Sequence, residues 1–122
     1  MGASISSILN LVEEEPADDL IFLAHNGPLG MGDEPHAMWG CDFKPGGGDW
    51  GDPDLTAAID HARSLGKRVL AVIGGHMHLR TKQGKERLWM QEIRNTLYIN
   101  AAARVKAISR SCRLAPIRAS IV

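Results

Sequence analysis

The stretch Val69–His78, with the sequence VLAVIGGHMH, decides the fold of this chain. Its first five residues are apolar and largely β-branched, which is typical of a strand buried on both faces in a parallel sheet. Two glycines follow, where the backbone can turn or approach a ligand closely. His76 and His78 come last, and residues two apart in extended backbone point to the same side. We therefore predict two imidazoles facing one point beyond the carboxyl end of a strand, where open α/β sheets tend to hold their sites.

A second junction of strand and histidine lies earlier in the chain. Residues 20–24 (LIFLA) predict another short buried strand, and His25 follows it directly. A helix is predicted over 53–65, between this strand and the strand over 69–73. The order strand, helix, strand is a βαβ crossover, which joins parallel neighbours. It places His25 at the same sheet edge as the later histidine pair, and imidazole is the commonest metal ligand among side chains.

Capping and turn residues mark the ends of the other predicted elements. Asp52 can cap the start of the helix between the two strands, and Gly66 can close its end. Residues 87–93 and 96–100 predict two more strands. The dipeptide Arg94-Asn95 between them predicts the turn of a β-hairpin, although it lacks the Asn-Gly signature.

The glycine-rich residues 27–51 have turn chemistry and almost no periodicity. A connection of this length is unusual in a compact domain unless it lines a site or is disordered. Trp39, Phe43 and Trp50 argue against disorder, so we expect a loop folded over the mouth of the sheet. His36 lies inside this loop and is interpreted as a surface residue.

The composition bounds the class of protein. A chain of 122 residues with 44% hydrophobic and 23% charged residues suits one small soluble domain. No apolar run approaches the roughly 20 residues that span a bilayer, and the start lacks the features of a secretory signal. Cys41 and Cys112 form no Cys-x-x-Cys pair, which favours free thiols in a reducing compartment. We expect a cytoplasmic protein without stable membrane insertion. Residues 1–6 fit an N-myristoylation pattern, but they are more simply the start of a helix.

Charge is distributed unevenly along the chain. Residues 1–60 hold 12 of the 14 acids and one base, whereas residues 61–122 hold 13 bases and two acids. A basic half can indicate nucleic-acid binding. Here the bases are scattered without interleaved aromatic residues, so no nucleic acid is expected. The two halves more simply meet each other, or meet sequence outside this chain.

The sequence Gly75-His76-Met77-His78 resembles the Gly-His-x-His motif of the calcineurin-like metallophosphoesterases. The strand ending at His25 and residues 96–102 (TLYINAA) resemble pieces of the same superfamily, in the same order. His25-Asn26-Gly27-Pro28 and residues 40–55 are similar to a branch of the family found in cyanobacteria and plants. The resemblance implies an α/β sandwich, in which two sheets pack together with helices outside.

The resemblance also implies a site and an activity. The family binds two divalent ions, typically Mn, Fe or Zn, which are bridged by an aspartate. His25 and His76 match the histidines that bind one metal, and His78 matches a ligand of the other. The implied activity is phosphatase or phosphodiesterase chemistry, in which a water activated by two metals attacks a phosphoester of unknown identity. No residue of this chain is assigned a direct catalytic role.

The chain departs from the family's pattern at its start. The family's Asp-x-His, Gly-Asp and Gly-Asn-His-Asp/Glu motifs lie N-terminal to the part matched here, and the second carries the bridging aspartate. Three neutral imidazoles cannot hold two dications close together without an anionic bridge. Asp42 and Asp49 have no spacing that makes them substitutes. We therefore expect a truncated form with a partial sandwich: a βαβ unit followed by a β-hairpin.

This expectation has consequences for domains and partners. Residues 1–105, which begin with a short amphipathic helix over 5–12, correspond to the C-terminal half of the phosphoesterase domain. Residues 106–122 have no persuasive period and are predicted to be a poorly ordered tail. Another chain could cover the missing half. The alternative is a catalytically inactive fragment that acts as a protein-binding or weak metal-binding module. A full-length plant relative could reside in the chloroplast.

Overall fold

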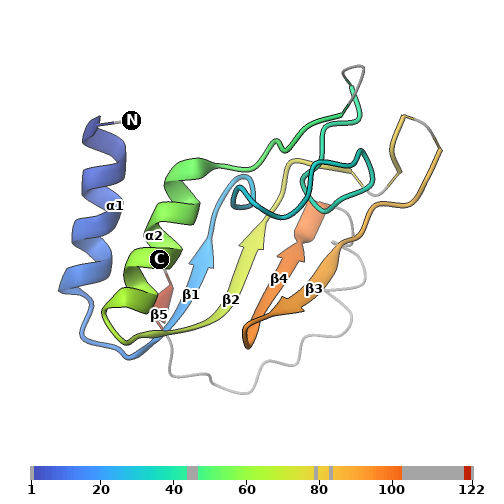
Figure 1. Ribbon diagram of the computed structural model, residues 1–122. Coiled ribbons are helices and arrows are strands. Elements are labelled where there is room, and N and C mark those ends of the chain that lie inside the picture. Colours follow the sequence, from blue (N-terminus) through green and yellow to red (C-terminus); the bar gives the residue numbers. More distant parts are fainter. Residues whose placement is uncertain (1, 44–46, 79, 83, 103–119, 122) are drawn as a thin grey trace.

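The computed structural model describes residues 2–43, 47–78, 80–82, 84–102 and 120–121. Within them the chain forms one mixed five-stranded sheet in the order β3-β4-β2-β1-β5, with two helices (Figure 1). The elements are α1 (Gly2–Glu14), β1 (Asp19–Leu23), α2 (Pro53–Ser64), β2 (Arg68–Gly74), β3 (Met90–Ile93), β4 (Thr96–Asn100) and β5 (Ser120–Ile121). No helix among the described residues is long and apolar enough to span a membrane.

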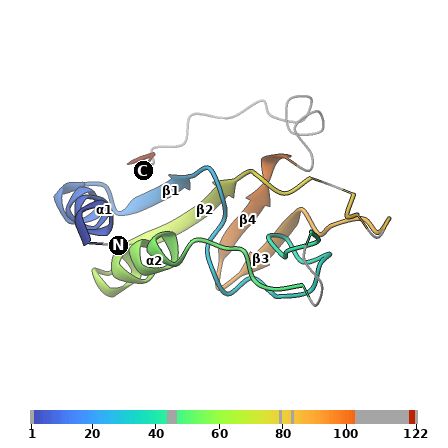
Figure 2. The ribbon, with the colours of Figure 1, turned by 90° about the horizontal axis from the view of Figure 1, so that it is seen from above.

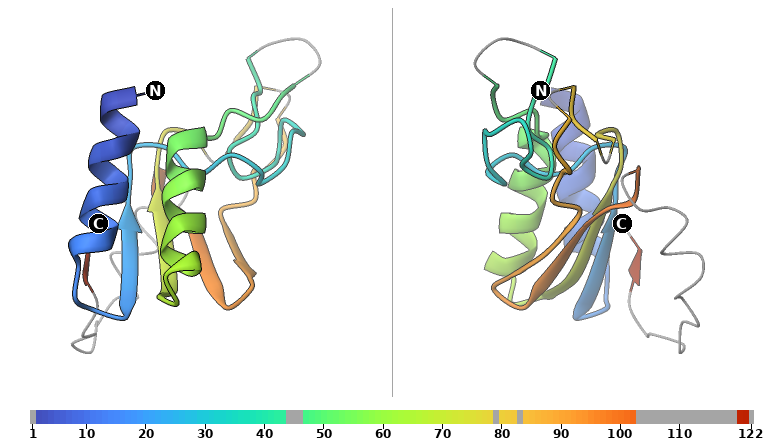
Figure 3. Two further views of the ribbon diagram at one scale, coloured as in Figure 1. Left: turned by 60° about the vertical axis from the view of Figure 1, so that its left-hand side comes forward. Right: turned by 90° about the vertical axis from the view of Figure 1, so that its right-hand side faces the viewer.

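The predicted βαβ unit is present and organises the sheet. β1 and β2 pair in parallel with Phe22 opposite Val72, and β2 pairs in parallel with β4 with Val72 opposite Tyr98. All three side chains are buried. α2 packs against β2, and α1 lies beside α2 (Figures 2 and 3). The core cluster between helices and sheet includes Val12, Leu20, Phe22, Leu55, Ala58, Ile59, Ala62, Val69, Val72 and Tyr98.

The end signals of α2 act as the sequence predicts. Asp52 is the N-cap, and its Oδ1 accepts a hydrogen bond of 2.8 Å from the backbone N–H of Asp54. Pro53 occupies the first turn, where the missing N–H costs nothing. Beyond the C-cap, Gly66 has a φ of +79°, a left-handed conformation that glycine adopts without strain. The helix therefore spans the predicted segment to within one residue.

The predicted hairpin is also confirmed, with one correction to its length. β3 and β4 pair antiparallel, and the turn residues Arg94 and Asn95 have φ values of 51° and 62°. Two successive positive φ values define the tight turn whose twist matches that of a hairpin. The strand expected over 87–93 begins only at Met90, because Arg87 is buried among loop carbonyls instead of pairing in the sheet.

The structure describes the two ends of the chain to different extents. The helix expected over 5–12 is longer and covers Gly2–Glu14. Most of the predicted tail, residues 106–119 and 122, lies outside the described residues. Ser120 and Ile121 are described, and they pair in parallel with β1.

Contacts between polar side chains join the acidic early part of the chain with the basic later part. Both guanidinium nitrogens Nε and Nη2 of Arg68 donate to Asp19, at 2.6 and 2.7 Å. This hydrogen bonding raises the pKa of Arg68 above its usual value. His61 lies 2.9 Å from Glu13, across the contact of α2 with α1. The two halves of the sequence thus meet each other in the fold, although exposed pairs of this kind each contribute only about 0–1 kcal/mol.

The N-cap of α2 gives a direct test of the fold. Asp52→Ala removes the acceptor for the amide of Asp54, and the free energy of unfolding should fall by about 1 kcal/mol. Asp60→Ala, on the exposed side of the same helix, should change it by less than about 0.5 kcal/mol. Urea denaturation of both variants measures the difference, and equal midpoints would contradict the capping role.

Candidate metal site at the carboxyl edge of the sheet

The predicted histidines lie at one edge of the sheet. His25 follows β1, and His76 and His78 follow β2. Because β1 and β2 are parallel neighbours, their carboxyl ends meet at this edge. The imidazole rings of His25 and His76 have centroids 5.4 Å apart and planes inclined at 53°. All three histidines are exposed.

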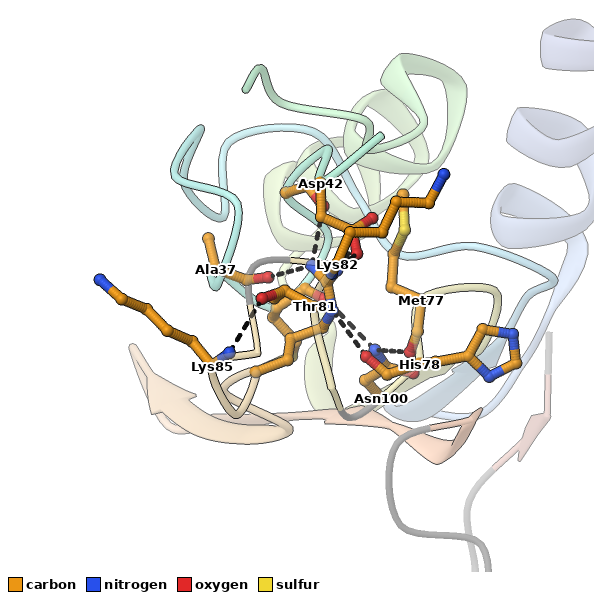
Figure 4. Close-up of polar contacts among 11 residues, drawn as sticks. Ala37, Asp42, Met77, His78, Thr81, Lys82, Lys85 and Asn100 are labelled. Carbon is orange, nitrogen blue, oxygen red and sulfur yellow. Dashed lines mark hydrogen bonds and ion pairs between the residues drawn. The ribbon is translucent and has the colours of Figure 1, made fainter. Parts of the chain in front are cut away.

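The backbone between His76 and His78 differs from the extended form expected from the sequence. His76 has a φ of 76°, in the left-handed region that non-glycine residues rarely occupy. The amide of Met77 donates to the carbonyl of Gly75 at 3.0 Å, and the Met77 side chain is buried. The rule that places residues two apart on one side therefore does not apply here. In Figure 4 the ring of His78 points away from the polar contacts around Asn100.

The structure therefore pairs two of the three predicted ligands. Among the described residues, no group of three or more His, Cys, Asp or Glu side chains is arranged to hold a metal ion. His36 is exposed on the long loop, as expected. The side chain of His61, on α2, is 27% exposed and bonds Glu13. Neither His36 nor His61 lies at the histidine edge, which is the edge of the sheet that carries His25, His76 and His78.

The long loop folds over this edge of the sheet, as the aromatic residues predicted (Figure 1). Trp39 is fully buried, and its indole Nε1 donates to the carbonyl of Gly75 at 3.0 Å. Asn26, next to His25, donates from Nδ2 to the carbonyl of Trp50 at 2.6 Å. The loop is thus tied to both histidine junctions. Trp50 also packs edge-on against Phe43, with ring centroids 5.0 Å apart.

The two carboxylates considered above as substitutes for the bridging acid, Asp42 and Asp49, hold the loops. Asp42 accepts from the amide of Lys82 at 2.9 Å and lies 3.5 Å from a guanidinium nitrogen of Arg87. Asp49 accepts from the amides of Gly30 and Gly51, at 2.6 and 2.9 Å. These contacts give each carboxylate a structural role, in agreement with the interpretation that neither replaces a bridging acid.

The donor set fits one metal ion better than two. Two imidazoles that share a tetrahedral ion, with metal–nitrogen bonds of about 2.0–2.1 Å, have ring centroids roughly 5 Å apart. The separation of His25 and His76 is close to this value. A second ion nearby would need an anionic bridge to offset the repulsion between the two dications. The described residues around the pair supply none.

Two residues that sequence reasoning did not single out are central to this edge. Asn100 and Arg87 are 0% and 2% exposed, and both donate to carbonyls of the histidine loop. The sequence of β4, TLYIN, could have pointed to Asn100. A side-chain amide at the end of an apolar strand is well placed to form a hydrogen bond with a neighbouring loop. For Arg87 the sequence gives no comparable signal.

Comparison with known proteins adds no relationship to this picture. No family model matches the chain. No curated protein and no solved structure matches it either. The interpretation of the site therefore depends on the residues and their geometry.

Two adjacent glycines at the end of β2 allow a matched test of how closely this strand end approaches residues 25–27, which follow β1. A Cβ on Gly74 would lie 2.8 Å from the backbone of Asn26 and Gly27, whereas a Cβ on Gly75 would meet nothing closer than 3.3 Å. Gly74→Ala should lower the free energy of unfolding by about 1–3 kcal/mol through overpacking. Gly75→Ala should cost less than about 1 kcal/mol. Thermal or urea unfolding measures both, and equal losses would show that the two junctions are not tightly apposed.

Proposed function

We propose that this chain provides the histidine ligands of a metal-dependent phosphoester hydrolase of the calcineurin-like type. The observation that carries the proposal is the His25–His76 pair, whose rings lie 5.4 Å apart at the ends of two parallel strands. Open α/β sheets hold their ligands at this position. The assignment to the calcineurin-like type depends on sequence resemblance. The strand that ends in His25 and the Gly-His-x-His sequence occur in the same order as in that family.

In this proposal His25 and His76 bind one divalent ion, of Mn, Fe or Zn, and His78 is a ligand of a second. When bound, such ions supply an activated water and neutralise charge on the phosphoryl oxygens. The described residues supply no carboxylate to bridge the two ions. In this proposal the bridging carboxylate comes from residues outside the described set or from another chain. The sheet seen here would then form one layer of the two-sheet sandwich. The substrate is a phosphoester, with its identity open.

The alternative proposal is a catalytically inactive module that binds one metal ion weakly or binds another protein. The observation that favours it is the lack of a third ligand near the His25–His76 pair among the described residues. Two exposed imidazoles can hold an ion, but they leave most of its coordination to water. Weak metal binding alone is therefore compatible with both proposals, and phosphoester hydrolysis separates them.

Metal binding is the first test. Titration of Zn²⁺ into the chain, followed by isothermal calorimetry, should show an ion held by imidazole nitrogens. His25→Ala and His76→Ala should each weaken it at least about tenfold, because each removes half of the described ligand pair. His36→Ala removes an exposed imidazole from the loop and should leave the affinity unchanged. Equal affinities in all four proteins would exclude a site at the His25–His76 pair.

Hydrolysis of p-nitrophenyl phosphate in the presence of Mn²⁺ is the second test. The phosphoesterase proposal expects a metal-dependent rate that falls at least about tenfold in His76→Ala, because a lost ligand removes the ion that polarises the phosphoryl group. His36→Ala should retain the full rate. Equal rates for the wild-type chain and His76→Ala, combined with metal binding by the wild type, would favour the inactive module.

A further inference from the structure

Arg87 is a buried charge placed between two loops of the candidate site. Its Nε donates to the carbonyl of His78 at 2.9 Å. Its Nη1 donates to the carbonyls of Ala37 and Gly40, at 2.8 and 2.7 Å. Asp42 lies 3.5 Å from Nη2, so the guanidinium also has a charge partner. One side chain thus links residues 75–78, the loop that carries His76 and His78, with the long loop that covers it.

The burial of Arg87 has an energetic cost that calls for a physical reason. Its side chain is only 1% exposed, and removing a guanidinium from water costs several kcal/mol before pairing. Burial lowers the pKa of Arg87, while Asp42 opposes that shift, and the group stays charged at physiological pH. An apolar residue would fill the same space at lower cost. Only a planar group with several fixed donors, however, can hold three carbonyls of two loops together.

Two further buried donors hold the carbonyls that precede His78. Asn100 is fully buried, and its Nδ2 donates to the carbonyls of Met77 and Met38, at 2.7 and 3.1 Å. The indole of Trp39 donates to the carbonyl of Gly75. The carbonyls of Gly75, Met77 and His78 are therefore each bonded by a buried donor from a different part of the chain. These bonds account for the left-handed backbone of His76, which would otherwise be unfavourable.

We propose that Arg87, supported by Asn100, is a positioning residue that fixes the turned backbone of the His76–His78 segment before any metal binds. Arg87 does not itself approach a ligand, because its guanidinium is enclosed by carbonyls. Its effect is to hold the imidazoles of His76 and His78 in one arrangement, so that little conformational freedom remains to be lost when an ion is bound. The effect on metal affinity rests on the proposed function, whereas the effect on the loop does not.

The experiment compares Arg87→Lys with Arg80→Lys, which changes an exposed arginine in the loop after β2. The first readout needs no metal. Amide hydrogen exchange of Gly75 and Met77, both hydrogen-bonded, should accelerate at least about tenfold in Arg87→Lys, because lysine cannot bond several carbonyls in fixed directions. Exchange of the buried β1 and β2 amides should not change. Arg80→Lys should leave both sets unchanged.

The second readout is the Zn²⁺ dissociation constant from calorimetry. It should rise about 10–100-fold in Arg87→Lys, the range typical of losing an outer-shell partner, and stay constant in Arg80→Lys. If Arg87→Lys folds and neither exchange nor affinity changes, the positioning role is overturned. If wild type binds no Zn²⁺ while exchange accelerates in the variant, the proposed function fails and the positioning role stands.

A milder variant covers the case in which Arg87→Lys does not fold. Asp42→Asn removes the charge partner of Arg87 but keeps an oxygen that can accept from the amide of Lys82. With the guanidinium less firmly held, exchange of Gly75 and Met77 should accelerate several-fold, again without change in the β1 and β2 amides. Unchanged exchange in Asp42→Asn would then overturn the proposal.

Discussion

The parallel pairing of β1 with β2 is the constraint on which the rest of this structure depends. It brings residues some fifty positions apart to one edge, so that two strand ends deliver their histidines to the same place. Parallel strands need a crossover, and α2 supplies it while covering the sheet with its apolar stripe. The close approach of Gly74 to Asn26 and Gly27 then sets how near the two junctions can come. The histidine edge is therefore a product of the topology.

Around this edge, polar groups have two different tasks. The buried donors of Trp39, Asn100 and Arg87 bond backbone carbonyls, and the carboxylates of Asp42 and Asp49 bond backbone amides or Arg87. All of them maintain the shape of the loops. The imidazoles of the edge, by contrast, are exposed and open to a ligand. A rigid, hydrogen-bonded support beneath a few accessible donors is the arrangement that a binding site requires.

Most of the fold could be predicted from local sequence, and the reason is physical. The apolar runs before His25 and His76, the cap at Asp52 and Gly66 at the helix end are signals that act within a few residues. The conformation of the histidine loop could not be predicted in this way. It depends on bonds from Trp39, Arg87 and Asn100 to carbonyls 9 to 36 residues away. Tertiary contacts of this kind override the extended conformation that the His-x-His spacing suggests.

The separation of charge along the chain has an effect beyond the native state. In the fold, Arg68 meets Asp19 and His61 meets Glu13, each pair joining the acidic half to the basic half. The same attraction acts between the halves when the chain is unfolded, because the opposite charges remain on one polymer. Added salt screens that attraction and lets the denatured ensemble expand. The denaturant dependence of unfolding, which follows the surface newly exposed, would then steepen as ionic strength rises.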